Sequence, residues 1–409
     1  FLNAQFREIK MSQLKTTLTP IVIIAFLIGA GLSGALTYTF TSSGGTLGGG
    51  GDTIAIGHIL PISGPLGQYS EGFSNGVQAA VNEANDLGGI NGKQIQLIEE
   101  DSATDPATAA EAARKLIEVN GVKAIIGVYA SSSTLAAAPI VEENEVIMIS
   151  PASTSPLVST AGEYIFRTAP SDDLQGKAMA QLALWSGAKT AAVIHINNQY
   201  GQGLNDVFTE EFENGGGNVL TSVPYNLEST TFRPELQQIM SVNPSVILDV
   251  SYADDGQIIF RESAELGLNA QWIGGDGIAD PAIFDAPGVA AAMKGMTGTM
   301  PASPDTSGNL HYTNVMSKYG LESGLYSREA YDAAKLAILA LSAAGPDATG
   351  AEIRDALIQM SATYVGASGD KAFDTNGDVG GQFTIWEVMD SEFVTIGSWD
   401  QVSGIKINE

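Results

Sequence analysis

From Asp52 onward the chain alternates short apolar runs with helical patterns, and this alternation limits the possible folds more than any other feature. Apolar runs bounded by turn residues predict buried strands, and the segments with a 3.6-residue period between them predict helices. Strands are predicted at residues 53–60, 93–101, 122–127, 146–150, 190–197, 218–225, 246–252 and 270–276. Helices are predicted between the first two strands and at residues 106–120, 131–144, 172–186, 201–214, 231–241, 255–267 and 327–345.

The strands and helices form two successive series, the second of which begins after Arg167. Strictly alternating strands and helices with apolar strands imply parallel sheets that are covered on both faces. A chain of 409 residues is long enough for two cores, because domains usually have about 100 to 200 residues. The predicted fold class is therefore α/β, with two doubly wound Rossmann-like lobes.

The composition excludes several classes of function. The chain has 46 acidic and 19 basic residues, a formal net charge of −27, and such a surface repels nucleic acid. Acidity of this kind is typical of a solvated surface. There is no cysteine, which rules out disulfides, thiolate nucleophiles and thiolate metal sites.

The N-terminal part predicts an association with the membrane. Residues 16–51 carry no charge, and Pro20–Phe40 is apolar and about long enough to cross a bilayer. Because Arg7, Lys10 and Lys15 precede this stretch, the N-terminus is expected in the cytoplasm and the bulk of the chain outside it. The expected parts are a cytoplasmic segment (1–19), a transmembrane anchor or signal segment (20–40) and a Gly/Ser linker (41–52).

Two outcomes remain open for that segment. A secretory signal has a similar basic start and apolar middle, so the chain is either tethered at the cell surface or secreted after cleavage. The long apolar stretch and the flexible linker after it favour a retained anchor.

Ligands of open α/β sheets bind beyond the carboxyl ends of the strands, so the residues there are the candidates for function. Two such loops are rich in hydroxyls and free backbone N–H groups: one contains Ser131 and the other contains Ala152, Ser153 and Thr154. Together with a helix N-terminus they could hold a carboxylate. Each loop taken alone is also explained by Ser131 or Thr154 capping a helix.

Other strand ends carry an acid and aromatic rings. Asp276 ends the strand at 270–276, Tyr252 ends the strand at 246–252, and Tyr200 follows the strand at 190–197. An acid beside aromatic rings suits an ammonium group. The two sets of residues together predict an amino-acid site between the lobes, with the ligand as the bridge that closes them.

At these positions the sequence resembles the type I periplasmic binding proteins, and among them the branched-chain amino acid (Leu/Ile/Val) receptors of ABC transporters. The similarity spans nearly all of residues 53–400. The motifs that carry it are GHILPISGPLGQYS (57–70), GGINGKQIQLIEEDSATDP (88–106), ASSSTLAAAPIVEENEVIMISPASTSP (130–156), NNQYGQG (197–203), SYADDGQ (251–257) and WIGGDG (272–277).

The resemblance implies roles for particular residues. Ser131, Ala152 and Thr154 would bind the carboxylate and amino group of the ligand, and Asp276 would face its ammonium group. Tyr69, Tyr200 and Tyr252 would line the pocket. Branched-chain receptors commonly have Glu where this chain has Asp276, which leaves the exact ligand in doubt.

The resemblance also implies three crossovers between the lobes, near residues 171, 300 and 378. The expected N-terminal lobe is then 53–171 with 301–378, and the expected C-terminal lobe is 172–300 with 379–409. The implied function is capture of an amino acid for delivery to ABC transporter permease subunits.

Other functions have weaker support. Receptors of this family for urea, short amides or another small carboxylate, and a sensor domain of a signalling system, remain alternatives. We expect no enzyme, cofactor or metal site, since no GxSxG, HExxH or Walker loop occurs and the three histidines lie far apart in the sequence. DTNGDVGG (374–381) hints at a calcium loop but lacks the spacing of one, and is better explained as an Asn-Gly turn.

Overall fold

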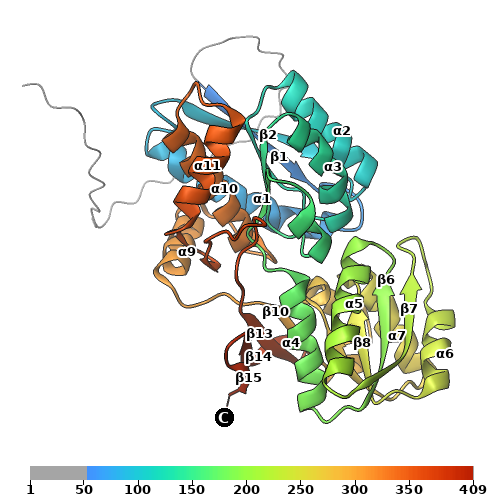
Figure 1. Ribbon diagram of the computed structural model, residues 1–409. Helices are drawn as coiled ribbons and strands as arrows, with labels where there is room; N and C mark the ends of the chain where they lie inside the picture. The colour runs from blue at the N-terminus through green and yellow to red at the C-terminus, as the bar shows by residue number, and fades with distance from the viewer. Residues whose placement is uncertain (1–52, 409) are drawn as a thin grey trace, which may run out of the picture. The chain divides into compact units, whose positions relative to one another are not determined.

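The computed structural model describes residues 53–408, which belong to one compact unit and form two lobes, each around its own sheet (Figure 1). The predicted segments 1–19, 20–40 and 41–52 lie outside the described residues. Within residues 53–408, no helix combines the length and the apolar character needed to span a membrane.

The first lobe is built on a five-stranded parallel sheet with the order β2-β1-β3-β4-β5. Its strands are β1 (Thr53–Leu60), β2 (Gln94–Asp101), β3 (Ala124–Ile126), β4 (Ile147–Ser150) and β5 (Ile165–Arg167). Its helices are α1 (Ser70–Asp86), α2 (Pro106–Arg114) with its π-helical continuation (Lys115–Val119), α3 (Ser131–Glu143), α9 (Ser307–Tyr319), α10 (Ser327–Ala344) and α11 (Gly350–Ser361). A small antiparallel pair, β11 (Val365–Gly366) and β12 (Gly369–Asp370), follows α11.

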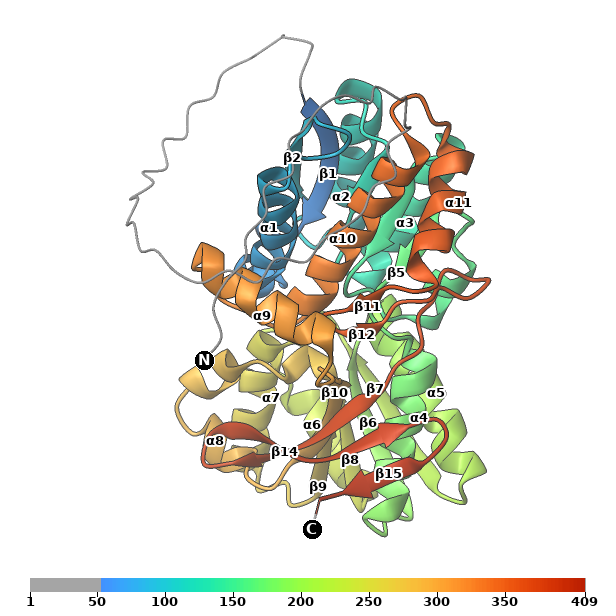
Figure 2. The same ribbon diagram turned by 90° about the vertical axis from the view of Figure 1, so that its left-hand side faces the viewer.

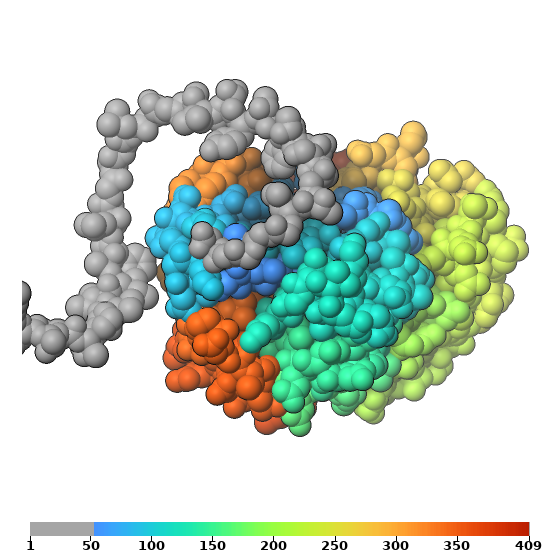
Figure 3. All heavy atoms as spheres, turned by 90° about the horizontal axis from the view of Figure 1, so that it is seen from above, coloured from blue at the N-terminus to red at the C-terminus, as the bar shows by residue number. Residues whose placement is uncertain are grey.

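Alternate side chains of this sheet enter two different apolar clusters. Ile126 belongs to the cluster that contains α1 and α10, whereas its neighbour Ile125 belongs to the cluster that contains α2 and α3. The sheet is therefore covered on both faces, as its apolar strands predict. Figures 2 and 3 show that the first lobe combines the blue-to-teal part of the chain with the orange part, which lies far away in sequence.

The second lobe is built on an eight-stranded sheet with the order β15-β14-β13-β10-β9-β8-β6-β7. Its strands are β6 (Thr190–Ile196), β7 (Asn218–Tyr225), β8 (Val246–Val250), β9 (Gln271–Gly274), β10 (Thr297–Pro301), β13 (Phe383–Met389), β14 (Glu392–Asp400) and β15 (Gly404–Ile407). Its α-helices are α4 (Asp172–Trp185), α5 (Gln199–Asn214), α6 (Arg233–Val242), α7 (Ala253–Leu266) and the short α8 (Val289–Ala292). Short 3₁₀ helices occur at Gly67–Tyr69, Pro156–Thr160, Asp276–Ile278 and Pro281–Asp285.

The prediction that both sheets are wholly parallel is wrong for the second one. β10 pairs antiparallel with β13, and β13, β14 and β15 continue as an antiparallel meander. A tight turn at Asp390 and Ser391, both with positive φ, returns the chain directly from β13 into β14 and makes these two strands antiparallel neighbours. A tight hairpin joins antiparallel neighbours, whereas parallel neighbours need a long crossover.

The strands and helices predicted between residues 53 and 276 are all present, with their ends shifted by a few residues. The helix predicted at 327–345 is α10. Sequence patterns did not predict β5, β10 or the meander β13–β15, nor the helices α9 and α11.

The chain passes between the two sheets in three segments. They lie between β5 and α4, between β10 and α9, and between β12 and β13 (Figure 2). These passages place the carboxyl ends of the parallel strands of both sheets at one shared cavity, which is described next.

Candidate ligand-binding site

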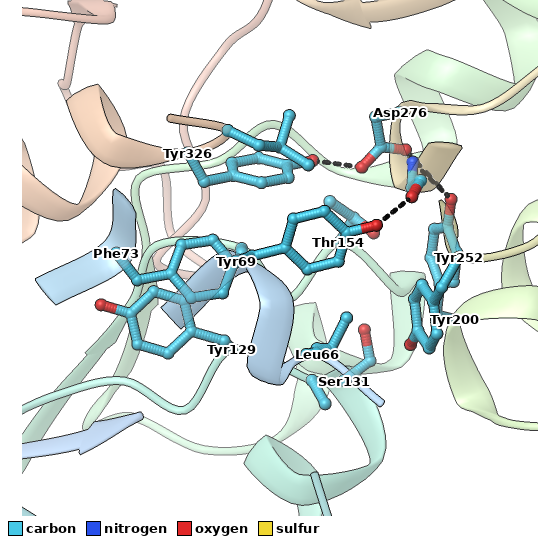
Figure 4. Close-up of a pocket in the computed structure, with 14 residues that line it drawn as sticks. Leu66, Tyr69, Phe73, Tyr129, Ser131, Thr154, Tyr200, Tyr252, Asp276 and Tyr326 are labelled. Atoms are coloured by element: carbon cyan, nitrogen blue, oxygen red, sulfur yellow. Dashed lines mark hydrogen bonds between the residues drawn. The ribbon is translucent and has the colours of Figure 1, made fainter. Parts of the chain in front are cut away.

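A cavity lies between the lobes (Figure 4). Residues of the first lobe supply most of its wall: Leu66, Tyr69, Phe73, Tyr129, Ala130, Ser131, Ala152, Thr154, Leu325 and Tyr326. Residues of the second lobe supply the rest: Tyr200, Tyr252, Asp276 and Gly277.

The first part of the site is the N-terminus of α3. Ser131 is the first residue of this 13-residue helix, and the preceding N-cap residue, Ala130, has no side chain that can accept a hydrogen bond from the first turn. The N–H groups of a first turn have no partner inside their own helix. Together with the helix dipole they make this end of the cavity attractive to an anion.

The loop after β4 adds donors beside that helix. The Ser155 N–H donates to Ser131 Oγ over 3.2 Å, so the loop and the helix start are in direct contact. Within residues 53–408, the Thr154 N–H has no hydrogen-bond partner, and Thr154 lines the cavity. The Thr154 N–H and the start of α3 therefore offer donors of the kind that bind a carboxylate.

The opposite wall carries the acid. Asp276 is buried at the carboxyl end of β9, and each of its oxygens accepts a tyrosine hydroxyl: Oδ1 from Tyr200 at 3.1 Å and Oδ2 from Tyr326 at 2.5 Å. Burial raises the pKa of Asp276, while the hydrogen bond from Tyr326 acts in the opposite direction. A cation in the cavity would favour the ionised carboxylate.

Two tyrosines of the second lobe form a stacked pair beside the acid. The rings of Tyr200 and Tyr252 are nearly parallel, with centroids 5.8 Å apart, and Asn198 Nδ2 donates to the Tyr252 hydroxyl over 3.2 Å. Gly277 leaves room for Tyr200, because a Cβ at that position would lie 3.0 Å from the Tyr200 hydroxyl oxygen. The stacked pair thus fixes the direction in which the Tyr200 hydroxyl meets Asp276.

Tyr69 links the two lobes directly. Its hydroxyl donates to the Gly277 carbonyl oxygen over 2.9 Å and accepts the Ala253 N–H over 3.0 Å. Tyr69 belongs to the first lobe, and its two partners belong to the second. The hydrogen bond from Tyr326 to Asp276 likewise joins the first lobe to the second. The structure therefore shows the lobes in contact across the cavity.

The remaining wall is apolar and aromatic. Phe73 and Tyr129 stack with centroids 4.2 Å apart, and Leu66 and Leu325 lie on the same cavity. The Tyr129 hydroxyl is within 2.9 Å of His58 Nε2, and His58 Nδ1 is within 3.1 Å of Glu99. The polar end of Tyr129 is thereby occupied, so its ring presents an apolar surface.

A second buried acid lies near the site but does not line the cavity. Asp172, the first residue of α4, is fully buried, and neither of its carboxylate oxygens has a hydrogen-bond partner within residues 53–408. Burial raises the pKa of Asp172 well above its usual value, and the charge of Asp276 adds to the effect. A raised pKa favours the neutral form of Asp172, so the negative charge at the second-lobe side of the cavity comes from Asp276.

Seven of the eight residues predicted for the site line this one cavity: Tyr69, Ser131, Ala152, Thr154, Tyr200, Tyr252 and Asp276. Ser153 does not line the cavity, so the structure does not support its predicted place among the ligand-binding residues. Its hydroxyl is 2.7 Å from Thr134 Oγ1 and donates to the Val128 carbonyl oxygen, and its N–H donates to Ser150 Oγ. Ser153 therefore anchors the loop to β4 and to α3, and has no donor left for a ligand.

Sequence reasoning missed the wall residues Leu66, Phe73, Leu325 and Tyr326, and the second acid Asp172. Tyr326 is the N-cap residue of α10 and lies in the loop after α9, so the expectation that ligands bind at strand ends gave no signal for it. Phe73 is spaced like any core residue of a helix, and Asp172 reads as an ordinary first-turn acid.

Two α/β lobes that place donors and an acid on opposite walls of one shared cavity define a two-lobed solute-binding receptor. Comparison with known sequences places the chain within this class: residues 53–392 match the periplasmic binding protein family, and the chain belongs to that family. It is therefore a solute-binding receptor, and its family is extracytoplasmic.

The relatives include receptors for several amino acids. The chain is 29% identical over 341 residues to a leucine-, isoleucine-, valine-, threonine- and alanine-binding protein of Pseudomonas aeruginosa, covering 82% of this chain and 90% of the relative. It is 30% identical to Leu/Ile/Val-binding protein homolog 1 of Brucella abortus, covering 80% of this chain and 87% of the relative.

Solved structures show the same fold. A leucine-binding protein of Thermotoga maritima superposes with a TM-score of 0.78 at 29% identity, covering 85% of this chain and 99% of that one. A solute-binding protein of R. palustris in complex with benzoate has a TM-score of 0.75 at 19% identity, covering 87% of this chain and 98% of that one. At this lower identity the second likeness concerns the fold alone.

Proposed function

We propose that this receptor captures an α-amino acid with an apolar side chain, of the leucine, isoleucine or valine type, and delivers it to the permease of an ABC transporter. The observation that carries the proposal is the arrangement of opposite charges across one cavity. Donors at the start of α3 and in the Thr154 loop belong to the first lobe, and the carboxylate of Asp276 belongs to the second. A zwitterion satisfies both at once and joins the lobes.

The apolar wall supports the choice of side chain. Phe73, Tyr129, Leu66 and Leu325 surround the part of the cavity that is left for a side chain, and the Tyr129 hydroxyl is already bonded to His58. Burying an aliphatic side chain contributes roughly 1.5 to 3 kcal/mol. The names of the Pseudomonas and Brucella relatives and of the Thermotoga structure agree with a ligand of this type.

The charge of the site separates an amino acid from a carboxylate without an amino group. Asp276 would repel a ligand whose only charge is negative, because its carboxyl group is buried on the cavity wall. An ammonium group near Asp276 balances this potential. We therefore place amino acids ahead of benzoate, urea or short amides.

We further propose that the receptor is tethered by Pro20–Phe40 and the Gly/Ser linker 41–52, and that it returns its ligand chemically unchanged. The uncharged stretch 16–51 and the three basic residues before it support the tether. Extraction of membranes with alkaline carbonate should leave a tethered chain in the membrane pellet. Release into the soluble fraction would show that the segment is cleaved or does not span.

A ligand screen tests the function directly. The full chain, purified in a mild detergent, would be heated with leucine, isoleucine, valine, alanine, benzoate, acetamide and urea, and its melting temperature recorded. A ligand that binds only the folded state raises that temperature by mass action. The branched amino acids should give the largest shifts and be recovered intact by mass spectrometry. A larger shift with benzoate or urea, or turnover of any of these ligands, would overturn the proposal.

A further inference from the structure

The structure contains a buried ion pair that connects the ligand loop to a distant part of the chain. Arg167, the last residue of β5, is fully buried, and its partner Asp378 lies in the segment between β12 and β13. Arg167 Nε donates to Asp378 Oδ1 over 2.6 Å, and Nη2 donates to Oδ2 over 2.9 Å. This bidentate geometry is the strongest form that such a pair takes.

The remaining donors of the guanidinium hold the loop after β4. Arg167 Nη1 donates to the carbonyl oxygens of Thr154 at 2.8 Å, Ser155 at 2.9 Å and Ser153 at 3.4 Å. The C=O and N–H of a trans peptide unit point in opposite directions. Because the carbonyls of Ser153 and Thr154 face Arg167, the N–H groups of Thr154 and Ser155 are turned away from it.

Those N–H groups are the ones that matter for a ligand. The Ser155 N–H reaches Ser131 Oγ at the cavity, and the Thr154 N–H has no partner within residues 53–408. The Thr154 carbonyl also accepts the N–H of Asp172, the first residue of α4 in the second lobe. The orientation of the whole loop thus depends on what holds its carbonyls.

Asp378 is itself fixed by the turn that the DTNGDVGG motif forms. Asp374 Oδ1 accepts the N–H groups of Asn376 and Asp378, and the Gly377 carbonyl accepts the Arg167 N–H over 3.0 Å. Gly377 has φ +75° and its Cβ position lies 2.4 Å from the Ile165 carbonyl oxygen, so the turn needs glycine there. The motif therefore builds a rigid acceptor for Arg167.

We propose that Arg167 and Asp378 are positioning residues that hold the Thr154 loop in the conformation that binds the ligand, so that the last passage between the sheets controls ligand affinity. The predicted change in ligand affinity rests on the proposed function. The predicted effect of the Arg167–Asp378 pair on the loop conformation does not depend on any ligand. Neither residue lines the cavity, so both act through the loop alone.

The chain offers a matched control. Lys371 is also buried and lies in the same segment between β12 and β13, and its Nζ donates to the carbonyl oxygens of Thr168 and Ser368. It links this segment to the first passage, as Arg167 does, but its hydrogen bonds do not reach residues 153–155. Lys371→Met therefore tests a general weakening of the same region without loss of the loop contacts.

The experiment compares wild type, Asp378→Asn, Arg167→Lys and Lys371→Met as full chains. Leucine affinity is measured by calorimetry, and hydrogen exchange of the ligand-free proteins is measured by mass spectrometry. The loop suits this measurement. Pro151 and Pro156 have no amide hydrogen, so the exchange of the loop comes from the four amide hydrogens of residues 152–155. Circular dichroism establishes that each variant is folded.

Asp378→Asn and Arg167→Lys should weaken leucine binding about tenfold or more and speed exchange at residues 152–155, with β1 unchanged. Lys371→Met should leave both within about twofold of wild type, since hydrogen bonds that do not reach the loop cannot set its conformation. Equal loop exchange in Asp378→Asn and wild type, or the same changes in Lys371→Met, would overturn the proposal. If wild type does not bind leucine, the proposed function fails, and loop exchange alone decides the positioning role.

Discussion

Asp276 is the residue on which recognition of an amino group depends, because it is the acid that lines the cavity. Its two oxygens already accept the hydroxyls of Tyr200 and Tyr326, so its position is fixed from both lobes. A carboxylate held in this way needs little rearrangement to receive a cation, which is the advantage of a preformed site.

Asp276→Asn should weaken leucine binding by roughly 2 to 5 kcal/mol, the usual cost of losing one partner of a buried charge pair. Calorimetry would measure the loss. The matched control is Asp254→Asn, which removes one negative charge from an exposed position of α7 and should leave affinity unchanged. Equal affinities of Asp276→Asn and wild type would place the amino group elsewhere.

The pH dependence of binding follows from the same carboxylate. Burial raises the pKa of Asp276 in the ligand-free protein, so protonation competes with binding of an ammonium group as the pH falls. Leucine affinity should therefore decrease between pH 8 and pH 5, and Asp276→Asn should remove most of that decrease. An affinity that rises on acidification would contradict this account.

Tyr69 is expected to act on closure of the lobes. Tyr69→Phe keeps the ring in the wall and removes the hydroxyl that joins Gly277 and Ala253. The expected loss is about 1 kcal/mol or somewhat more in leucine binding, seen mainly as faster dissociation in stopped-flow experiments. Tyr319→Phe, which removes an exposed hydroxyl bonded to Asp86, serves as the control. A variant that dissociates at the wild-type rate would exclude the link.

At the level of single elements, apolar periodicity predicted every strand from β1 to β4 and from β6 to β9. Most of these strands are largely buried and read as nearly continuous apolar runs, whereas the edge strands β2 and β7 are partly exposed and mix apolar with polar residues. β5 has three residues and β10 ends in proline, so neither gives a periodic signal. The turn at Asp390 and Ser391 lacks the glycine that usually marks a two-residue hairpin, so the sequence did not predict the meander β13–β15.

The candidate site was predictable where it follows strands. Ser131, Thr154 and Asp276 stand directly after β3, β4 and β9, and the sheet topology brings them together. Tyr326 lies in the loop between two helices, α9 and α10, and Asp378 lies in the passage between β12 and β13, so no local pattern indicates their spatial neighbours. Arg167 looked like the end of a series of elements, and only the structure shows the six acceptors around it.

The capping box of α11 gives a prediction about a single element. Thr349 accepts the Glu352 N–H, and the Glu352 side chain accepts the Thr349 N–H. Thr349→Ala should lower the free energy of unfolding by about 1 kcal/mol in urea titrations. Leucine affinity should be unchanged, because α11 does not line the cavity. A large loss of affinity would show that this helix is coupled to the site.

At the level of the whole molecule, buried acids set the dependence of stability on pH. Burial raises the pKa of Asp249 to about 7, that of Asp255 to about 6 and that of Glu329 to about 7. Between about pH 4 and 7 the folded chain keeps protons that the unfolded chain releases, so the free energy of unfolding falls as the pH rises. The net charge of −27 acts in the same direction.

The ligand-free protein should therefore melt at a higher temperature at pH 5 than at pH 8. Asp249→Asn removes one titrating group, so the variant should gain stability relative to wild type between pH 5 and pH 8. The gain between these two pH values is about 3 kcal/mol, since only the roughly two pH units between pH 5 and the folded-state pKa of about 7 contribute and each corresponds to about 1.4 kcal/mol. Calorimetric scans at both pH values measure it. A variant with the same pH dependence as wild type would exclude Asp249 as a cause.

The central claim is that two lobes hold opposite ends of one zwitterion, and ligand truncation tests it most directly. Calorimetry with wild-type protein would compare leucine with 4-methylpentanoate, which lacks the amino group, and with leucinamide, which lacks the carboxylate. We predict that each analogue binds at least about 30-fold more weakly than leucine, because each leaves one charged group of the site without its partner. Binding of 4-methylpentanoate as tight as that of leucine would contradict the account.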